Sequence, residues 1–380
     1  MISWIARLEE CNVHHPCELP GGRVLSVDAL RGFDMFWIIG GKKIFKGLDE
    51  ACDTPLTNWL FSQLDHAEWY GFTFYDLIMP LFLFLVGISM VYSTRKRLGT
   101  VPSAQVLWKH IGIRIAWLWV LGMAVQGKLL TYDVNQIKLY SNTLQAIAAG
   151  YLFASIIILY LPVVRQIAVT LFLMLVTWGA FLWIPVPGFG TNTYAPDGNV
   201  AIAFDKLILG RFQDGTTYTW ILSSLNFGAT TMLGVFTGYL LQSRLSALQK
   251  FYGLLLSGIA LVVMGLLWSI WHPLIKHLWT GSFVLFSGGL CIILLSVFYG
   301  IIDVFEYRKW SFPLVVIGSN AIAAYVSANI FDYRLVAKVF VGGLEQYVGS
   351  WYPFVLAAGG FSVLYLLLLY LYRNKIFVKV

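Results

Sequence analysis

Charged side chains are scarce in this chain. Asp, Glu, Lys and Arg make up only 12% of its 380 residues, whereas hydrophobic residues make up 58%. Soluble globular domains carry about 25% charged residues. The scarcity of charge therefore excludes an ordinary soluble protein and indicates an all-α polytopic membrane protein. In such a protein the net charge of +7 reflects loop topology and anionic lipid, so we expect a lipid bilayer, and no nucleic acid, as a partner.

Cysteine is rare as well, and four residues make no disulfide framework. Cys11 and Cys17 flank His14 and His15, which are residue types that hold zinc. The segment is short and lacks a second pair of ligands, so we expect a polar arm there and no metal.

Apolar runs of about 20 residues, the length that crosses a bilayer, recur along the chain. We predict ten spans at about these positions: 27–44, 72–92, 111–130, 144–161, 167–184, 221–241, 251–271, 282–302, 312–331 and 353–372. The segment 333–343 is predicted to be a re-entrant or interfacial helix. The predicted organisation is an N-terminal arm (1–24), one ten-helix transmembrane domain (25–373) and a tail (374–380).

Basic residues set the predicted orientation. A cytoplasmic N-terminus places Arg95, Lys96, Arg97 and most other loop cations in the cytoplasm, as the positive-inside rule requires. No apolar core of a cleavable signal is visible in the first 24 residues, so we expect the first span to direct insertion. We therefore predict a multi-pass protein of the cell membrane. A homodimer is one option for its assembly.

Two ionisable residues flank the entrance of the second span. His66 lies in a polar loop, and Asp76 follows about two turns into the predicted helix, near Pro80, which we expect to loosen that helix. Ionisable groups in a membrane are costly and often mark chemistry or transport. A histidine beside Trp69 is also a common interfacial residue without chemistry, so both interpretations stand.

The first span carries three charges. Asp28, Arg31 and Asp34 follow one another at three-residue spacing and share one broad helix face, which we expect to look into the bundle. They form either a neutralised ion pair that fixes packing or a polar vestibule for a charged ligand.

Six segments resemble, in order, motifs of the heparan-α-glucosaminide N-acetyltransferase family. They are Ser26-Val-Asp-Ala-Leu-Arg-Gly32, His66-Ala-Glu-Trp-Tyr-Gly71 with Asp76-Leu-Ile-Met-Pro80, Thr143-Leu-Gln145, Ser223-Ser-Leu-Asn226, Lys276-His-Leu-Trp279 and Gly318-Ser-Asn320. The similarity runs from about residue 23 to 372.

The resemblance implies a membrane acyltransferase that moves an acetyl group from cytosolic acetyl-CoA to an amino sugar on the other side. His66 matches the family's active-site histidine, as a general base or a transient acetyl carrier, and imidazole chemistry permits both roles. We predict that Asp76 joins His66 in the catalytic site, where it would orient the imidazole or hold the sugar; the alternative is that it only pairs with another helix.

Coenzyme A needs cations and polar side chains. We predict that it is bound by residues on several spans, namely Asp28, Arg31, Arg114, Gln145, Asn226 and Asn320. Arg114 lies inside an apolar run and needs a partner or ligand. The amides of Gln145, Asn226 and Asn320 suit either a channel or contacts between helices. Arg95, Lys96, Arg97, Lys109 and His110 would form a phosphate cradle or simply follow the positive-inside rule.

We predict that Asp34, Lys42, Trp69 and Trp279 contact the acceptor, beneath an outer loop spanning 185–219. Lys42 stands where the family has asparagine, and Ala146 replaces its arginine, so the implied acceptor is an amino sugar rather than a heparan chain. The alternative function is an amino-sugar permease, because polar side chains inside a helix bundle also describe a substrate path.

Overall fold

The computed structural model describes residues 24–98 and 104–378. It is all-α: these residues form helices and helical turns, with no β-strand among them. Contacts divide them into two units, the first comprising 69–71 and 79–296 and the second comprising 24–68, 72–78 and 297–378. Arg95, Lys96 and Arg97 lie where side chains are not described, and Cys11, His14, His15 and Cys17 lie outside the described residues.

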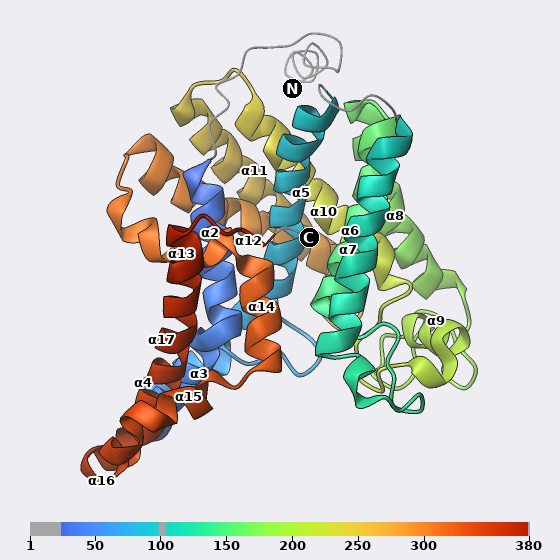
Figure 1. The fold of residues 1–380 in the computed structure, drawn as a ribbon. Helices are drawn as coiled ribbons and strands as arrows, with labels where there is room; N and C mark the ends of the chain where they lie inside the picture. The colour runs from blue at the N-terminus through green and yellow to red at the C-terminus, as the bar shows by residue number, and fades with distance from the viewer. Residues whose placement is uncertain (1–23, 99–103, 379–380) are drawn as a thin grey trace. The chain divides into compact units, whose positions relative to one another are not determined.

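The first unit is a bundle of long helices (Figure 1). Its elements are α5 (Ile78–Leu98), α6 (Ala104–Val125), α7 (Thr143–Tyr160), α8 (Val163–Trp183), α9 (Val200–Leu209), α10 (Ser223–Gln242), α11 (Ala247–Trp268) and α12 (Gly281–Tyr299), with short turns η3 (Leu129–Thr131) and η4 (Gly210–Phe212). Helix α10 is the centre of this unit, because it packs on α7, α8 and α11 and is buried along most of its length.

Glycines allow α5 and α10 to approach closely. A Cβ on Gly87 would lie 2.0 Å from the Thr231 carbonyl oxygen, and one on Gly234 would lie 1.9 Å from that of Phe84. Backbone contact of this kind is the usual role of small residues in membrane helices.

The second unit begins with a helical run that contains a π-helical segment. Helix α2 (Leu25–Phe36) continues through the π-helical segment η1 (Trp37–Gly41) into α3 (Lys42–Cys52), followed by α4 (Pro55–Gln63) and the 3-10 turn η2 (Phe74–Leu77). Later elements are η5 (Gly300–Val304), η6 (Lys309–Ser311), α13 (Phe312–Ser319), α14 (Ala321–Ile330), α15 (Tyr333–Val341), η7 (Gly342–Leu344), α16 (Glu345–Val348), η8 (Gly349–Trp351) and α17 (Tyr352–Arg373). Helix α2 packs on α13, and α3 and α15 pack on α17.

Each of the ten predicted spans coincides with a helix or helical run. In the described residues, seven such runs are long and apolar enough to cross a membrane, and α13 with α14, bent by 66°, would make eight. The other two are the charged run α2–α3 and the polar, buried helix α10. Helices α2 and α10 are buried along most of their length, where polar side chains can find protein partners, whereas α3 is buried only at Gly47.

Two details differ from expectation. Asp76 lies in η2, immediately before α5, and not two turns inside a helix. Pro80 is the third residue of α5. Backbone N–H groups in the first turn of a helix have no acceptor within it, so the missing N–H of Pro80 does not loosen α5. The predicted re-entrant or interfacial segment is α15, whose nine residues are too few to cross a bilayer.

Candidate active site

The His66 loop connects α4 to η2, and His66 and both of these elements belong to the second unit. Thr54 caps the start of α4, which ends at Gln63 and is followed by the C-cap residue Leu64. The chain then turns back at Thr73, whose carbonyl accepts from the Asp76 N–H at 3.0 Å. This turn brings Asp76 beneath the loop that carries His66.

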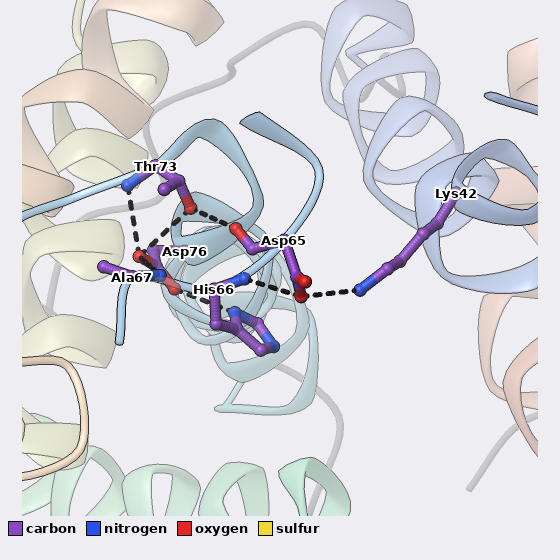
Figure 2. A network of polar contacts seen from close by, with 6 residues as sticks. All are labelled: Lys42, Asp65, His66, Ala67, Thr73 and Asp76. Carbon is purple, nitrogen blue, oxygen red and sulfur yellow. Dashed lines mark hydrogen bonds and ion pairs between the residues drawn. The ribbon is translucent and has the colours of Figure 1, made fainter. Parts of the chain in front are cut away.

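A buried carboxylate holds the imidazole (Figure 2). His66 Nδ1 lies 2.8 Å from Asp76 Oδ1, with the histidine side chain 38% exposed and the aspartate side chain only 1% exposed. Asp76 Oδ2 accepts from the backbone N–H groups of Ala67 at 3.2 Å and Thr73 at 3.1 Å. A carboxylate fixed in this way favours the tautomer with a proton on Nδ1, which places the basic lone pair on Nε2.

Thr73 closes the loop from the other side. Its hydroxyl donates to the Asp65 carbonyl at 2.6 Å and lies 3.2 Å from Asp76 Oδ2. The loop is therefore tied at both ends to the turn that carries the carboxylate, and the position of the imidazole follows from the backbone.

Lys42 reaches the same loop from α3. Its Nζ donates to Asp65 Oδ1 at 3.1 Å, and this hydrogen bond is the main reason that the pKa of Asp65 lies below its ordinary value. The ammonium also lies 4.8 Å from the centroid of the Tyr75 ring, which is 5.0 Å from the imidazole. The second unit thus gathers Lys42, Tyr75 and His66.

The charged face of α2 contains an ion pair and a solitary carboxylate. Arg31 Nη1 donates to Asp28 Oδ1 at 3.0 Å, which supports the ion-pair interpretation of these two residues. Asp34 is fully buried, and no group in the described residues donates to either of its oxygens. As expected, Asp28 and Asp34 point into the protein.

The predicted amides make contacts within the protein. Asn320 donates to the Ile376 carbonyl at 3.1 Å and accepts from the Val378 N–H at 2.9 Å. Gln145 accepts from the Ser141 N–H at 2.8 Å and donates to the Leu139 carbonyl at 2.7 Å. Asn226 donates to the Trp279 carbonyl at 2.6 Å and accepts from Thr177. These bonds support a structural role for all three.

Arg114 is different, because it retains unused hydrogen-bonding capacity. Its guanidinium carbon lies 4.4 Å from the centroid of the Tyr151 ring, while its buried Nε has no acceptor in the described residues. Lys109 and His110 are exposed on the same helix.

The two predicted tryptophans are core residues of the first unit. Trp69 donates to the Tyr194 carbonyl at 2.8 Å, and Trp279 donates to Thr230 at 3.0 Å. Both are almost completely buried, so they shape the protein interior around their neighbours.

Sequence reasoning missed three members of the second-unit network, Asp65, Thr73 and Tyr75. All three lie in the same stretch as His66 and Asp76, and their proximity in sequence was the available signal. It also missed the buried His272, which accepts or donates a hydrogen bond with Tyr194 at 2.9 Å and whose pKa burial lowers to about 3.

In the described residues, no group of three or more His, Cys, Asp or Glu side chains is gathered as a metal site. Comparisons with protein-family models and with curated proteins give no match to this chain.

Proposed function

We propose that this protein is a membrane acyltransferase that moves an acetyl group from acetyl-CoA to an amino sugar. The observation that carries the proposal is the His66–Asp76 pair, in which a buried carboxylate orients a half-exposed imidazole. This is the arrangement of a general base with its orienting acid. The motif resemblance supplies the donor and the class of acceptor.

In the proposed reaction, His66 Nε2 takes a proton from the acceptor ammonium. The free amine attacks the thioester carbonyl, so that a C–N bond forms and the C–S bond breaks. The leaving thiolate takes the proton from the imidazolium, and the new amide nitrogen releases its extra proton to solvent. Asp76 keeps the imidazole in place and stabilises its charged form.

Acetyl-CoA carries phosphates and needs cationic contacts. Arg114 fits this need in part, since its buried Nε has no acceptor among the described residues and a guanidinium suits phosphate oxygens. The Asp28–Arg31 pair fits less well, because each charge is offset by the other. We propose a cell-membrane location with a cytoplasmic N-terminus, so that the donor enters from the cytoplasm and His66 faces the opposite side.

The test is acetyl transfer by the purified protein from radiolabelled acetyl-CoA to glucosamine. We expect labelled N-acetylglucosamine to form in proportion to protein. Uptake of glucosamine into proteoliposomes without acetylation would contradict the enzyme and support a permease. Labelled protein after a rapid quench, with label on His66, would identify the imidazole as an acetyl carrier.

A further inference from the structure

Asp34 is an acidic side chain that has no part in the His66–Asp76 pair. It is fully buried in α2, and neither carboxyl oxygen receives a hydrogen bond from residues 24–98 or 104–378. A carboxylate left unpaired in a protein interior is strongly disfavoured, and more so at membrane depth. Asp34 therefore requires either a proton or a cation.

A second unpaired group lies one helical turn away. The indole N–H of Trp37 is buried and has no acceptor in the part of the chain that the structure describes. Trp37 is also the first residue of η1, and short π-helical segments often occur at functional sites. An unused acceptor and an unused donor thus occur at i and i+3 on one helix, which is the spacing of side-chain neighbours.

The Asp34–Trp37 pair is linked to the His66–Asp76 pair through Tyr75 and its neighbour Phe74 in η2. The Tyr75 hydroxyl lies within electrostatic range of the Asp34 and Asp65 carboxyl groups, and the Tyr75 ring packs against His66 and beneath the Lys42 ammonium. Trp37 packs against Phe74, the residue before Tyr75 in η2, with 5.1 Å between the ring centroids.

Neighbouring ionisable groups leave Asp34 unpaired. On its own helix, Arg31 is bonded to Asp28, and in η5 Asp303 accepts from the Ser26 N–H. Helix α13 has no ionisable side chain and α14 has only Tyr325, and neither donates to Asp34.

We propose that Asp34 and Trp37 form the subsite for the amino end of the acceptor, with Asp34 binding the ammonium and the Trp37 N–H binding an adjacent hydroxyl oxygen. Asp34 holds a proton in the resting protein and releases it to solvent when the ammonium arrives, so that a neutral acid becomes a carboxylate–ammonium pair. The ligand class is a primary amine with a hydroxyl group on the neighbouring carbon, as in glucosamine. This inference rests on the proposed amine acceptor.

Infrared spectroscopy of the purified protein tests the resting state. At neutral pH we expect a protonated-carboxyl band that is lost in Asp34→Asn and retained in the matched control Asp49→Asn. Asp49 also has a buried oxygen without a donor but lies on α3, outside the site. A wild-type band unaffected by Asp34→Asn, or no band at all, would overturn the proposal.

A second test adds glucosamine to the wild-type protein, so its result does not depend on the folding of a variant. Saturating glucosamine should remove the band and release about one proton, whereas neutral N-acetylglucosamine should do neither. The Asp34→Asn variant should raise the KM for glucosamine at least about 10-fold, the effect of losing one charged hydrogen bond. A band that persists with glucosamine under conditions where acetylation proceeds would overturn the proposal. Proton release without any acetylation would leave the subsite standing and instead contradict the acyltransferase.

Discussion

At the scale of single residues, the site depends on how Asp76 is held. One of its oxygens faces the His66 imidazole, and the other accepts two backbone N–H groups from the loop that carries His66. The carboxylate therefore positions both the loop and the imidazole. Its effect on the reaction should be transmitted through His66 and not through contact with substrate.

Replacing Asp76 with Asn should lower kcat by about 10²- to 10⁴-fold with little change in KM, because the amide no longer selects the tautomer that is basic at Nε2. The pH–rate profile should change as well, since the carboxylate no longer stabilises the imidazolium. Steady-state kinetics with Asp49→Asn as control measure both effects. Unchanged kcat in a folded Asp76→Asn protein would show that the contact is only structural.

The Lys42–Asp65 pair illustrates the opposite case. Its two side chains are 32% and 66% exposed, and exposed ion pairs contribute about 1 kcal/mol or less to stability. We expect Lys42→Met to leave the melting temperature almost unchanged in thermal unfolding, while raising the pKa of Asp65 toward its ordinary value. A large loss of stability would mean that Lys42 supports the fold and not the acceptor.

At the scale of secondary-structure elements, the second unit depends on the contact of α2 with α13. A Cβ on Gly32 would lie 1.7 Å from the Leu314 carbonyl oxygen, and one on Gly318 would lie 2.1 Å from that of Asp28. The two helices touch through their backbones, and this contact sets the position of the α2 face that carries Asp28, Arg31 and Asp34.

Gly32→Ala should therefore reduce the yield of folded protein severely. The matched control is Gly112→Ala in α6, where an added Cβ meets nothing within 4 Å. That change should be neutral or slightly stabilising, since alanine favours a helix over glycine by about 1 kcal/mol. Size-exclusion profiles of the two variants in detergent compare them directly, and equal yields would contradict the close α2–α13 contact.

Helix α9, which follows α8 in the chain, contains a further buried carboxylate, Asp205. Asp205 accepts from the backbone N–H groups of Trp220 at 2.8 Å and Ile221 at 2.9 Å, and burial raises its pKa from 3.8 to about 6. Between these values the folded protein binds a proton that the unfolded chain does not. The contribution of Asp205 to the free energy of unfolding is thus fully present below its ordinary pKa of 3.8 and declines as pH rises through about 6.

We expect the wild-type melting temperature to include a component that falls between about pH 4 and pH 7, and Asp205→Asn to lack it. Thermal unfolding in detergent across this range measures the difference between the two proteins. An identical pH dependence in both would show that Asp205 does not titrate in the folded state over this interval.

At the scale of the whole molecule, each of the ten spans predicted from apolar run length coincides with a helical run, and seven or eight of these runs, in the part of the chain that the structure describes, are long and apolar enough to cross a bilayer. Short helices such as α4, α9 and α16 were not predicted, because their length does not stand out in the sequence. The loop network was less predictable. His66 and Asp76 stood out as costly polar residues, but their 2.8 Å contact depends on the turn at Thr73 and on Asp76 lying before α5. Some hydrogen-bond partners are distant in sequence, as where Asn320 donates to the Ile376 carbonyl. The length of an apolar run contains no information on such partners.

The proposed topology is tested by thiol labelling in intact cells, using a background without native cysteines. Tyr132 is 90% exposed between α6 and α7, so a Tyr132→Cys variant should react with an impermeant reagent added outside the cells. Leu248 is 50% exposed at the start of α11, and a Leu248→Cys variant should react only after the cells are lysed. The reverse pattern would place the N-terminus outside.

The central proposal is that His66 carries out acetyl transfer, and single-turnover transfer from radiolabelled acetyl-CoA to glucosamine measures it most directly. We expect His66→Ala to lose at least about 100-fold in rate, the usual contribution of a general base, while Asp49→Asn retains the wild-type rate. A folded His66→Ala protein that transfers acetyl at the wild-type rate would contradict the proposal.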